Sequence, residues 1–208
     1  VDVEFANLPT GEPIRSNITV VDPDGTTTKL NAPGTHFDAQ LREKLDALVV
    51  ERSKGAEWVV LAGSLPPGLE PTYYSELVAA LRASGYAGKI AIDTSEAPLI
   101  ATVAGEHKPT LIKPNSEELA QLTGSDNWEE LEASPELTAR TAQKLLGDGI
   151  EYVLATLGGG GAVLVGPWLL SVSLLLPLDD PRMTTTSVAD SYRWLGEAMV
   201  DTLAELGV

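Results

Sequence analysis

The feature that most constrains this chain is a repeated alternation of short apolar runs with longer segments of helical periodicity. Apolar runs that lack polar alternation are typical of strands buried on both faces of a sheet. Four such runs are found, at 58–62, 89–93, 110–112 and 152–156. Parallel strands need a crossover segment between them, so this order predicts an α/β fold with a mostly parallel sheet and helices on both of its faces.

Helical segments fill the intervals between the runs and end at residues that favour helix termination. The first extends from Asp38 to near Gly55, with leucines at helical spacing and charged residues between them. Two further strands are expected at 162–165 and 170–176. The other segments expected to be helical are 71–84, 97–104, 116–122, 135–146 and 190–206.

The N-terminal stretch has a different pattern, with two β-branched runs on either side of a turn. Residues 14–21 and 26–30 flank Asp22-Pro23-Asp24-Gly25, and a Pro-Asp-Gly sequence is typical of a tight turn. We therefore expect a β-hairpin and its connection over residues 1–36. An α/β core is expected over residues 37–208.

The charge balance argues against several classes of function. The chain carries 14 Lys and Arg against 30 Asp and Glu, a formal net charge of −16 at pH 7. A field this negative repels a phosphate backbone, so no nucleic-acid partner is expected. The hydrophobic fraction of 43% is too high for a disordered acidic tail and is sufficient for a sizeable core.

Cysteine content and hydropathy narrow the class further. The chain has no cysteine, which excludes a disulfide scaffold, a thiolate zinc site and a cysteine nucleophile. Its longest apolar run, Leu169–Leu176, is too short to span a bilayer, so no membrane association is expected. The stretch Val1–Leu8 is acidic and does not have the pattern of a signal peptide. These features predict a globular, cytoplasmic protein.

In an open α/β sheet, ligands bind at the carboxyl ends of the strands, so the loops after the predicted strands are the candidate site. The first loop is Gly63-Ser64-Leu65-Pro66-Pro67-Gly68, in which two glycines bracket a rigid pair of prolines. The Ser64 hydroxyl and nearby amides would hold a phosphate or a sugar hydroxyl there. The same residues also fit an ordinary connection between a strand and a helix.

The loop after residues 110–112 combines a cation, an amide and a carboxylate. Lys113 offers a point charge for a phosphate, and Glu118 would hold a hydrated Mg²⁺ through water. Asn115 and Glu118 are also spaced as an N-cap residue and an acidic residue at the third helical position, a pair that caps helices. The sequence leaves both interpretations open.

Two more loops complete the candidate site. Thr156 is followed by Leu157 and by four glycines at 158–161, which would let the backbone approach a nucleotide closely. A hairpin turn is the alternative, and the pattern matches neither a dinucleotide-binding fingerprint nor a Walker A motif. Asp190 precedes the last predicted helix, where it would act as a general base or interact with the helix dipole.

In this order and spacing, the loops resemble those of the PfkB (ribokinase-like) family of carbohydrate kinases, in particular its 1-phosphofructokinase and tagatose-6-phosphate kinase branch. The resemblance extends from about Gly11 to Ala162. It implies a ribokinase-like three-layer α/β/α fold in which the front hairpin is part of a β-lid over the sugar. The stretches that carry it are Leu61–Gly68, Asp93–Ser95, Lys113–Leu119 and Thr156–Ala162.

The resemblance also implies a reaction and a set of partners. Such kinases transfer the γ-phosphoryl group of ATP to a sugar hydroxyl with Mg²⁺ bridging the phosphates. The implied acceptor is fructose 1-phosphate, giving fructose 1,6-bisphosphate, or tagatose 6-phosphate, giving tagatose 1,6-bisphosphate. A homodimer formed through the β-lid is a further expectation.

The roles implied by the resemblance fall on particular residues of this chain. Arg15 and Ser64 would bind the sugar phosphate, and a guanidinium suits that task because it contacts phosphate with two donors. Asp190 would be the catalytic base, and Glu118 would serve the metal. The residues that would line the nucleotide are Lys113, Asn115, Thr156, Gly158 and Gly161.

Departures from the family pattern support an alternative. No Gly-Gly-Lys-Gly sugar-binding stretch lies upstream of the hairpin, so we expect the N-terminal portion of the family domain to be absent from this sequence. The family's Gly-Ala-Gly-Asp is matched only as Ser187-Val188-Ala189-Asp190, and Glu96 stands where the branch usually has glycine. The alternative function is a non-catalytic or truncated relative that binds nucleotide or sugar phosphate without turnover.

Overall fold

The structure is a computed structural model that describes residues 4–12, 15–22, 26–158, 160–166 and 172–174. Its strands are β1 (Asn17–Val21), β2 (Thr27–Asn31), β3 (Trp58–Ala62), β4 (Lys89–Asp93), β5 (Leu111–Ile112), β6 (Tyr152–Thr156), β7 (Ala162–Val165) and β8 (Val172–Leu174). Its helices are α1 (Ala39–Arg52), α2 (Tyr73–Ala83), α3 (Glu96–Ala104), α4 (Ser116–Thr123), α5 (Trp128–Ala133) and α6 (Pro135–Ala142), with a 3-10 turn, η1, at Gln143–Leu145.

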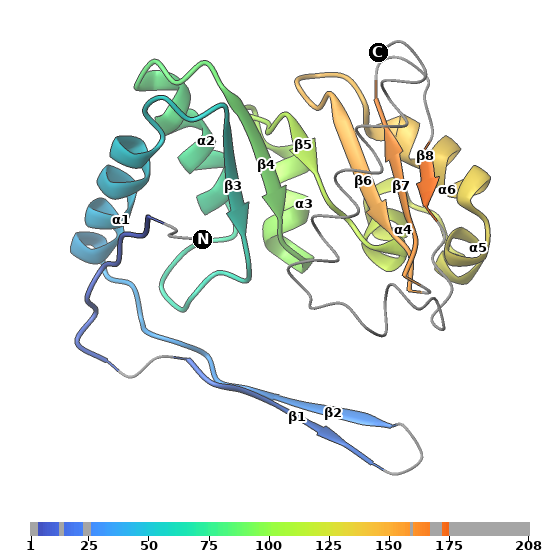
Figure 1. Ribbon diagram of the computed structural model, residues 1–208, viewed down its shortest axis with the longest axis horizontal. Coiled ribbons are helices and arrows are strands. Elements are labelled where there is room, and N and C mark those ends of the chain that lie inside the picture. Colours follow the sequence, from blue (N-terminus) through green and yellow to red (C-terminus); the bar gives the residue numbers. More distant parts are fainter. Residues whose placement is uncertain (1–3, 13–14, 23–25, 159, 167–171, 175–208) are drawn as a thin grey trace.

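A six-stranded sheet in the order β3-β4-β5-β6-β7-β8 forms the centre of the molecule (Figure 1). Strands β3 to β6 are parallel, whereas β7 and β8 run antiparallel to their neighbours. The predicted mostly parallel sheet is therefore confirmed. Because four parallel strands end at one edge of the sheet, the loops that follow them lie next to one another.

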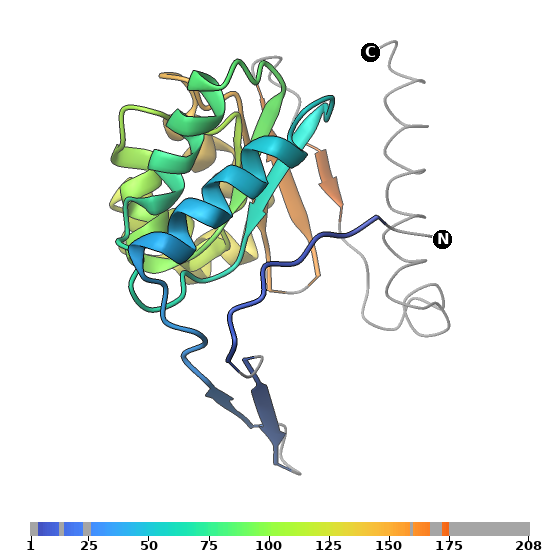
Figure 2. The same ribbon diagram turned by 90° about the vertical axis from the view of Figure 1, so that its left-hand side faces the viewer.

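One face of the sheet is buried beneath the helices. Ile90, Ile92, Ile112, Val153 and Val163 alternate along their strands and are all 0% exposed. The described helices lie on this side of the sheet, as Figure 2 shows. Burial of these branched side chains is the main contribution to the stability of the core, at about 1.5–3 kcal/mol for each fully buried side chain.

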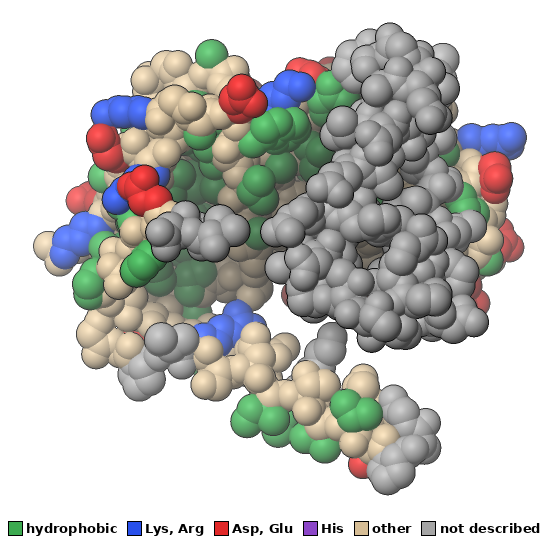
Figure 3. Space-filling view, viewed as in Figure 1, with side chains coloured by type: hydrophobic (Ala, Val, Ile, Leu, Met, Phe, Trp, Pro, Cys, Tyr) green, Lys and Arg blue, Asp and Glu red, His purple; other side chains and the backbone are tan. Residues whose placement is uncertain are grey.

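The opposite face carries apolar side chains that remain accessible. Val60 and Trp58, both in the edge strand β3, are 64% and 40% exposed. Figure 3 shows hydrophobic side chains gathered on this face. Beside them, the Lys89 ammonium lies 5.3 Å from the centroid of the Trp58 ring. The described residues thus form two of the three expected layers, namely the sheet and one layer of helices against it.

The predicted front hairpin is confirmed and extends away from the sheet (Figures 1 and 2). Strands β1 and β2 pair antiparallel, with Ile18 opposite Leu30. Both of these side chains are more than half exposed, as is Val21. A two-stranded hairpin is only marginally stable when it is isolated in water, so this one depends on its connections or on a partner surface.

The elements differ from the sequence prediction mainly around α5 and α6. The helix expected over 135–146 ends as an α-helix at Ala142 and continues as η1. Helix α5 was not predicted, because its six residues are too few to show a helical period. The helix expected over 190–206 lies outside the described residues. Across the described ranges, none of the helices has the length and apolar character needed to cross a membrane.

Candidate functional site

The loops after the parallel strands are joined by main-chain hydrogen bonds that continue the pairing of the sheet. The Gly63 amide donates to the Asp93 carbonyl at 2.9 Å, and the Lys113 amide donates to the Ile92 carbonyl at 3.0 Å. The Thr156 amide donates to the carbonyl of Pro114 at 2.9 Å. The predicted stretches after β3, β4, β5 and β6 therefore form one continuous edge.

The loop from Gly63 to Gly68 is fixed by its two glycines. Gly63 has φ +113°, and its carbonyl accepts hydrogen bonds from the Tyr74 hydroxyl at 2.8 Å and the Thr94 hydroxyl at 3.0 Å. Gly68 has φ +93°, and a Cβ at that position would overlap the Phe37 carbonyl oxygen. Both positions require glycine, because a side chain strains a left-handed backbone and has no room at the second one.

Arg15 from the base of the hairpin reaches this loop across 49 residues of sequence. Its Nη1 donates to Ser64 Oγ at 2.7 Å, and its Nε donates to Asn17 Oδ1 at 3.0 Å. A cavity of about 470 Å³ lies beside this contact. The polar and charged residues that line the cavity are Arg15, Asn31, Ser64, Ser95 and Glu96.

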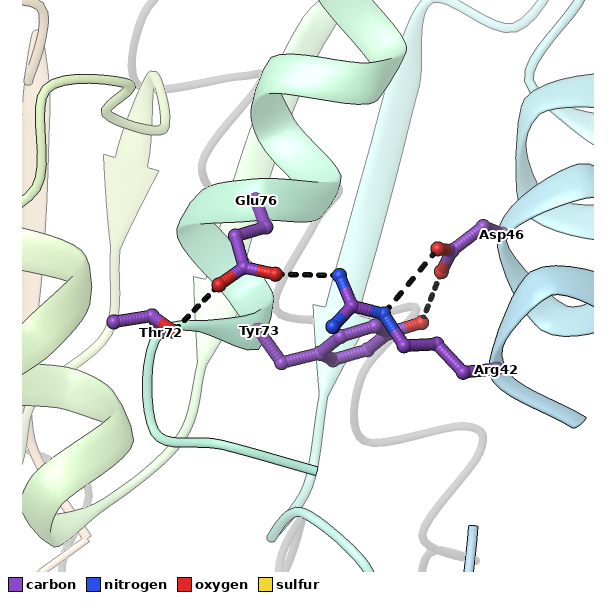
Figure 4. Close-up of polar contacts among 5 residues, drawn as sticks. All are labelled: Arg42, Asp46, Thr72, Tyr73 and Glu76. Carbon is purple, nitrogen blue, oxygen red and sulfur yellow. Dashed lines mark hydrogen bonds and ion pairs between the residues drawn. The ribbon is translucent and has the colours of Figure 1, made fainter. Parts of the chain in front are cut away.

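A network of hydrogen bonds and ion pairs joins α1 to the start of α2, the helix that follows the Gly63–Gly68 loop (Figure 4). The Tyr73 hydroxyl donates to Asp46 Oδ1 at 2.6 Å, and burial raises the pKa of Tyr73 above its ordinary value. Glu76 accepts from the Thr72 hydroxyl at 2.6 Å and pairs with Arg42. These contacts lower the pKa of the Glu76 carboxyl, the hydrogen bond from Thr72 having the largest effect. The first turn of α2 is thereby fixed against α1.

Lys113 lies at the end of β5, where it forms an ion pair with Asp93 at the end of β4. The Lys113 ammonium and Asp93 Oδ1 are 3.0 Å apart, and the two side chains are 33% and 44% exposed. The pair is thus accessible from the edge of the sheet. The role in phosphate binding that the sequence suggested for Lys113 stays a prediction.

Asn115 and Glu118 form the capping pair that the sequence left as one of two interpretations. Asn115 Oδ1 accepts from the Glu118 amide, and Glu118 Oε2 accepts from the Asn115 amide, each at 2.8 Å. This reciprocal arrangement is a complete capping box at the start of α4. Among the described residues, no three His, Cys, Asp or Glu side chains come together as a metal site.

Gly158, Gly160 and Gly161 lie in the turn between the antiparallel strands β6 and β7. The Leu157 amide donates to the Gly161 carbonyl at 2.8 Å, and Gly160 has φ +84°. A smaller cavity, of about 210 Å³, lies beside Thr156 and Gly158. The hairpin-turn interpretation is therefore confirmed, and the turn also borders a cavity.

Two residues of this smaller cavity were missed by the sequence reading. Trp128 and Glu132 line it from α5, together with Asn115 from the capping box. The Glu132 carboxylate occupies the space that a side chain at Gly158 would need. The sequence signal for Trp128 was a tryptophan in a short acidic segment. Only the fold shows that Trp128 and Gly158 line the same cavity. Asp190 and the three residues before it lie outside the described residues.

Comparisons with known proteins agree with this arrangement. The model of the pfkB family of carbohydrate kinases matches residues 1–173. A 1-phosphofructokinase of Rhodobacter capsulatus is 32% identical over 184 residues, which are 85% of this chain and 53% of that protein. The chain thus spans about half the length of this relative.

Solved structures give the same result for the fold. The structure of Escherichia coli phosphofructokinase-2 in complex with fructose-6-phosphate matches with a TM-score of 0.65 at 27% identity, over 79% of this chain and 52% of that chain. Ribokinase from Giardia lamblia matches with a TM-score of 0.54 at 16% identity, over 79% of this chain and 49% of that chain, which shows likeness of fold alone. By its sequence and its ribokinase-like α/β fold, the chain belongs to the pfkB family of carbohydrate kinases.

Proposed function

We propose that this protein is an ATP-dependent kinase that phosphorylates a hydroxyl group of a sugar phosphate, either fructose 1-phosphate or tagatose 6-phosphate. The observation that carries the proposal is the contact of the Arg15 guanidinium with Ser64 Oγ, at 2.7 Å, beside a 470 Å³ cavity. An arginine beside a hydroxyl at the carboxyl end of a strand suits a phosphate-bearing ligand. Membership of the family and the likeness to a 1-phosphofructokinase support this choice of substrate.

The arrangement of the two cavities supports a transfer between two ligands. One cavity lies at the end of β3 and the other at the end of β6, three strand spacings away, or roughly 14 Å. Asp93 and Lys113 lie between them, at the ends of β4 and β5. A sugar phosphate beside Arg15 and a nucleotide beside Thr156 and Gly158 would therefore meet near the Lys113 ammonium.

The proposed reaction is an in-line phosphoryl transfer. The acceptor hydroxyl oxygen forms a bond to the γ-phosphorus of ATP, and the bond from that phosphorus to the β,γ-bridging oxygen breaks. The hydroxyl proton passes to the Asp190 carboxylate, and ADP leaves. Lys113 offsets negative charge on the transferred group, and Asn115, Gly158 and Gly161 border the nucleotide. The bisphosphorylated sugar is the second product.

A magnesium ion fits this site only in association with the nucleotide. Mg²⁺ is usually held by one or two carboxylates, several waters and the phosphates of its substrate. Glu118 supplies one carboxylate, of which the capping box uses Oε2. When bound, the ion offsets charge on the phosphates. The chain's own contribution would be to orient Glu118 through its hydrogen bond to the Asn115 amide.

We further propose that the hairpin acts as the β-lid and pairs with a second copy of the chain in the cytoplasm. The exposed apolar side chains Ile18, Val21 and Leu30 support this, because a partner surface would remove them from water. The alternative function, binding of nucleotide or sugar phosphate without turnover, is favoured by Ser187 and Ala189, which stand where the family pattern has its two glycines before Asp190.

Calorimetric titration with fructose 1-phosphate and with tagatose 6-phosphate tests the sugar-phosphate site. The Arg15→Ala variant should bind the preferred ligand at least about tenfold more weakly, because a charge-assisted pair contributes roughly 1.5–3 kcal/mol. Arg52→Ala is the matched control, since Arg52 is an exposed arginine that pairs with Glu4 and does not line the cavity. Equal affinities of the Arg15 and Arg52 variants would contradict the proposed site.

A further inference from the structure

Glu96 has an unusual backbone for its residue type. Its φ is +56°, in the left-handed region that favours glycine, although it is the first residue of α3. A carboxylate-bearing residue adopts this conformation at a cost in free energy that glycine would avoid. Strain of this kind is concentrated at functional sites, where the side chain has a role that offsets it.

The side chain of Glu96 lines the same cavity as Arg15. Of the described residues that line this cavity, only these two carry ionisable side chains. The Glu96 carboxylate is exposed, and it forms no hydrogen bond or ion pair with another described residue. The cavity therefore offers one cation and one free anion to a ligand, with the neutral polar groups of Asn31, Ser64 and Ser95 between prolines and leucines.

We propose that Glu96 is a specificity-determining residue that selects sugar monophosphates over sugar bisphosphates in this cavity. The proposal rests on the proposed function, because it takes the ligand's phosphate to lie at Arg15. The carboxylate would accept hydrogen bonds from sugar hydroxyls. A second phosphate on the same sugar would instead meet a like charge.

The physical basis of this selection is repulsion rather than an added attraction. Like charges that face each other in a partly enclosed cavity interact more strongly than they do in bulk water. Specificity is the difference between two affinities, and a charge placed against the unwanted ligand increases that difference. Since the proposed kinase makes a bisphosphate, Glu96 would also weaken the hold of the site on its own product.

The test is calorimetric titration of the full chain with fructose 1-phosphate and with fructose 1,6-bisphosphate, in the absence of ATP. In Glu96→Gln, the affinity for the bisphosphate should rise roughly tenfold relative to that for the monophosphate, as expected for loss of one screened charge repulsion. Glu96→Gly should show the same change in the ratio and a higher melting temperature. That second variant also guards against a folding defect, because glycine suits the observed φ.

Two results separate this inference from the function on which it rests. If the ratio of the two affinities is the same in the wild type, Glu96→Gln and Glu96→Gly, Glu96 does not determine specificity. If Arg15→Ala still weakens the binding of both sugars, the proposed sugar-phosphate site stands without it. If the wild type binds neither of these sugars nor tagatose 6-phosphate, or if Arg15→Ala binds its ligands as well as the wild type does, the proposed site and the role of Glu96 both fall. In Glu96→Gln, the affinity for the bisphosphate should rise relative to that for the monophosphate. A smaller rise at high salt would support charge repulsion as its cause.

Discussion

Single residues at the edge of the sheet show that one side chain can serve both the fold and the site. Glu118 is the clearest case, because its carboxylate closes the capping box of α4 and is also the carboxylate that we propose for the metal. The two roles need different properties of the side chain. Capping needs an acceptor oxygen, whereas metal binding needs the negative charge.

This difference gives a prediction for Glu118→Gln and Asn115→Ala. Glutamine keeps an acceptor at the third helical position, so Glu118→Gln should change the free energy of unfolding little while raising the Mg²⁺ concentration needed for turnover. Asn115→Ala removes the N-cap acceptor and should lower the free energy of unfolding by about 1 kcal/mol. Chemical denaturation and a magnesium titration of activity measure the two effects. An unchanged magnesium requirement in Glu118→Gln would leave Glu118 with the capping role alone.

At the scale of elements, the start of α2 determines where the Gly63–Gly68 loop lies. The network of Arg42, Asp46, Thr72, Tyr73 and Glu76 fixes this helix against α1, as Figure 4 shows. Its pH dependence follows from Glu76, whose pKa is lowered in the folded protein from an ordinary value of 4.5. The stabilisation is therefore fully present above about pH 4.5 and is lost as the pH falls through the lower folded pKa.

We expect Glu76→Gln to lower the free energy of unfolding at pH 7 by up to about 1 kcal/mol, as for other partly exposed ion pairs. The difference between the variant and the wild type should be smaller at pH 3 than at pH 7, because pH 3 lies below the ordinary pKa of 4.5 that the carboxyl has in the unfolded chain. Urea denaturation at both pH values measures this. Glu70→Gln is the control, because the Glu70 side chain is exposed and has no partner among the described residues. A difference that persists unchanged at pH 3 would exclude the Glu76 charge as its source.

The sequence predicted the elements better than their contacts. Strands such as β4 and β6 were predictable because buried parallel strands have continuous apolar runs with glycines and prolines between them. Helix α5 was not, because a six-residue helix shows less than two periods. The contact between Arg15 and Ser64 also lay beyond the sequence pattern alone, because it joins residues 49 positions apart. Only the resemblance to a family suggested that the two act together.

At the scale of the whole molecule, the chain has the edge of the sheet that carries the candidate loops but spans about half the length of its 1-phosphofructokinase relative. The sheet face that carries Val60 and Trp58 is apolar and accessible, which is typical of an interaction surface. The net charge of −16 does not oppose a phosphorylated ligand. Arg15 and Lys113 lie in the cavity and at the edge, where local charge outweighs a distant and screened field.

The function that we propose for this chain is phosphoryl transfer from ATP to a sugar phosphate. The most direct test follows ADP release with Mg-ATP and fructose 1-phosphate, and with tagatose 6-phosphate in its place, for the wild type and Asp190→Asn. We predict turnover by the wild type with one of the two sugars and a rate at least about a hundredfold lower for Asp190→Asn, because a general base contributes roughly 10²–10⁴-fold. Equal, background-level ADP release by both proteins would contradict the kinase function and favour binding without turnover.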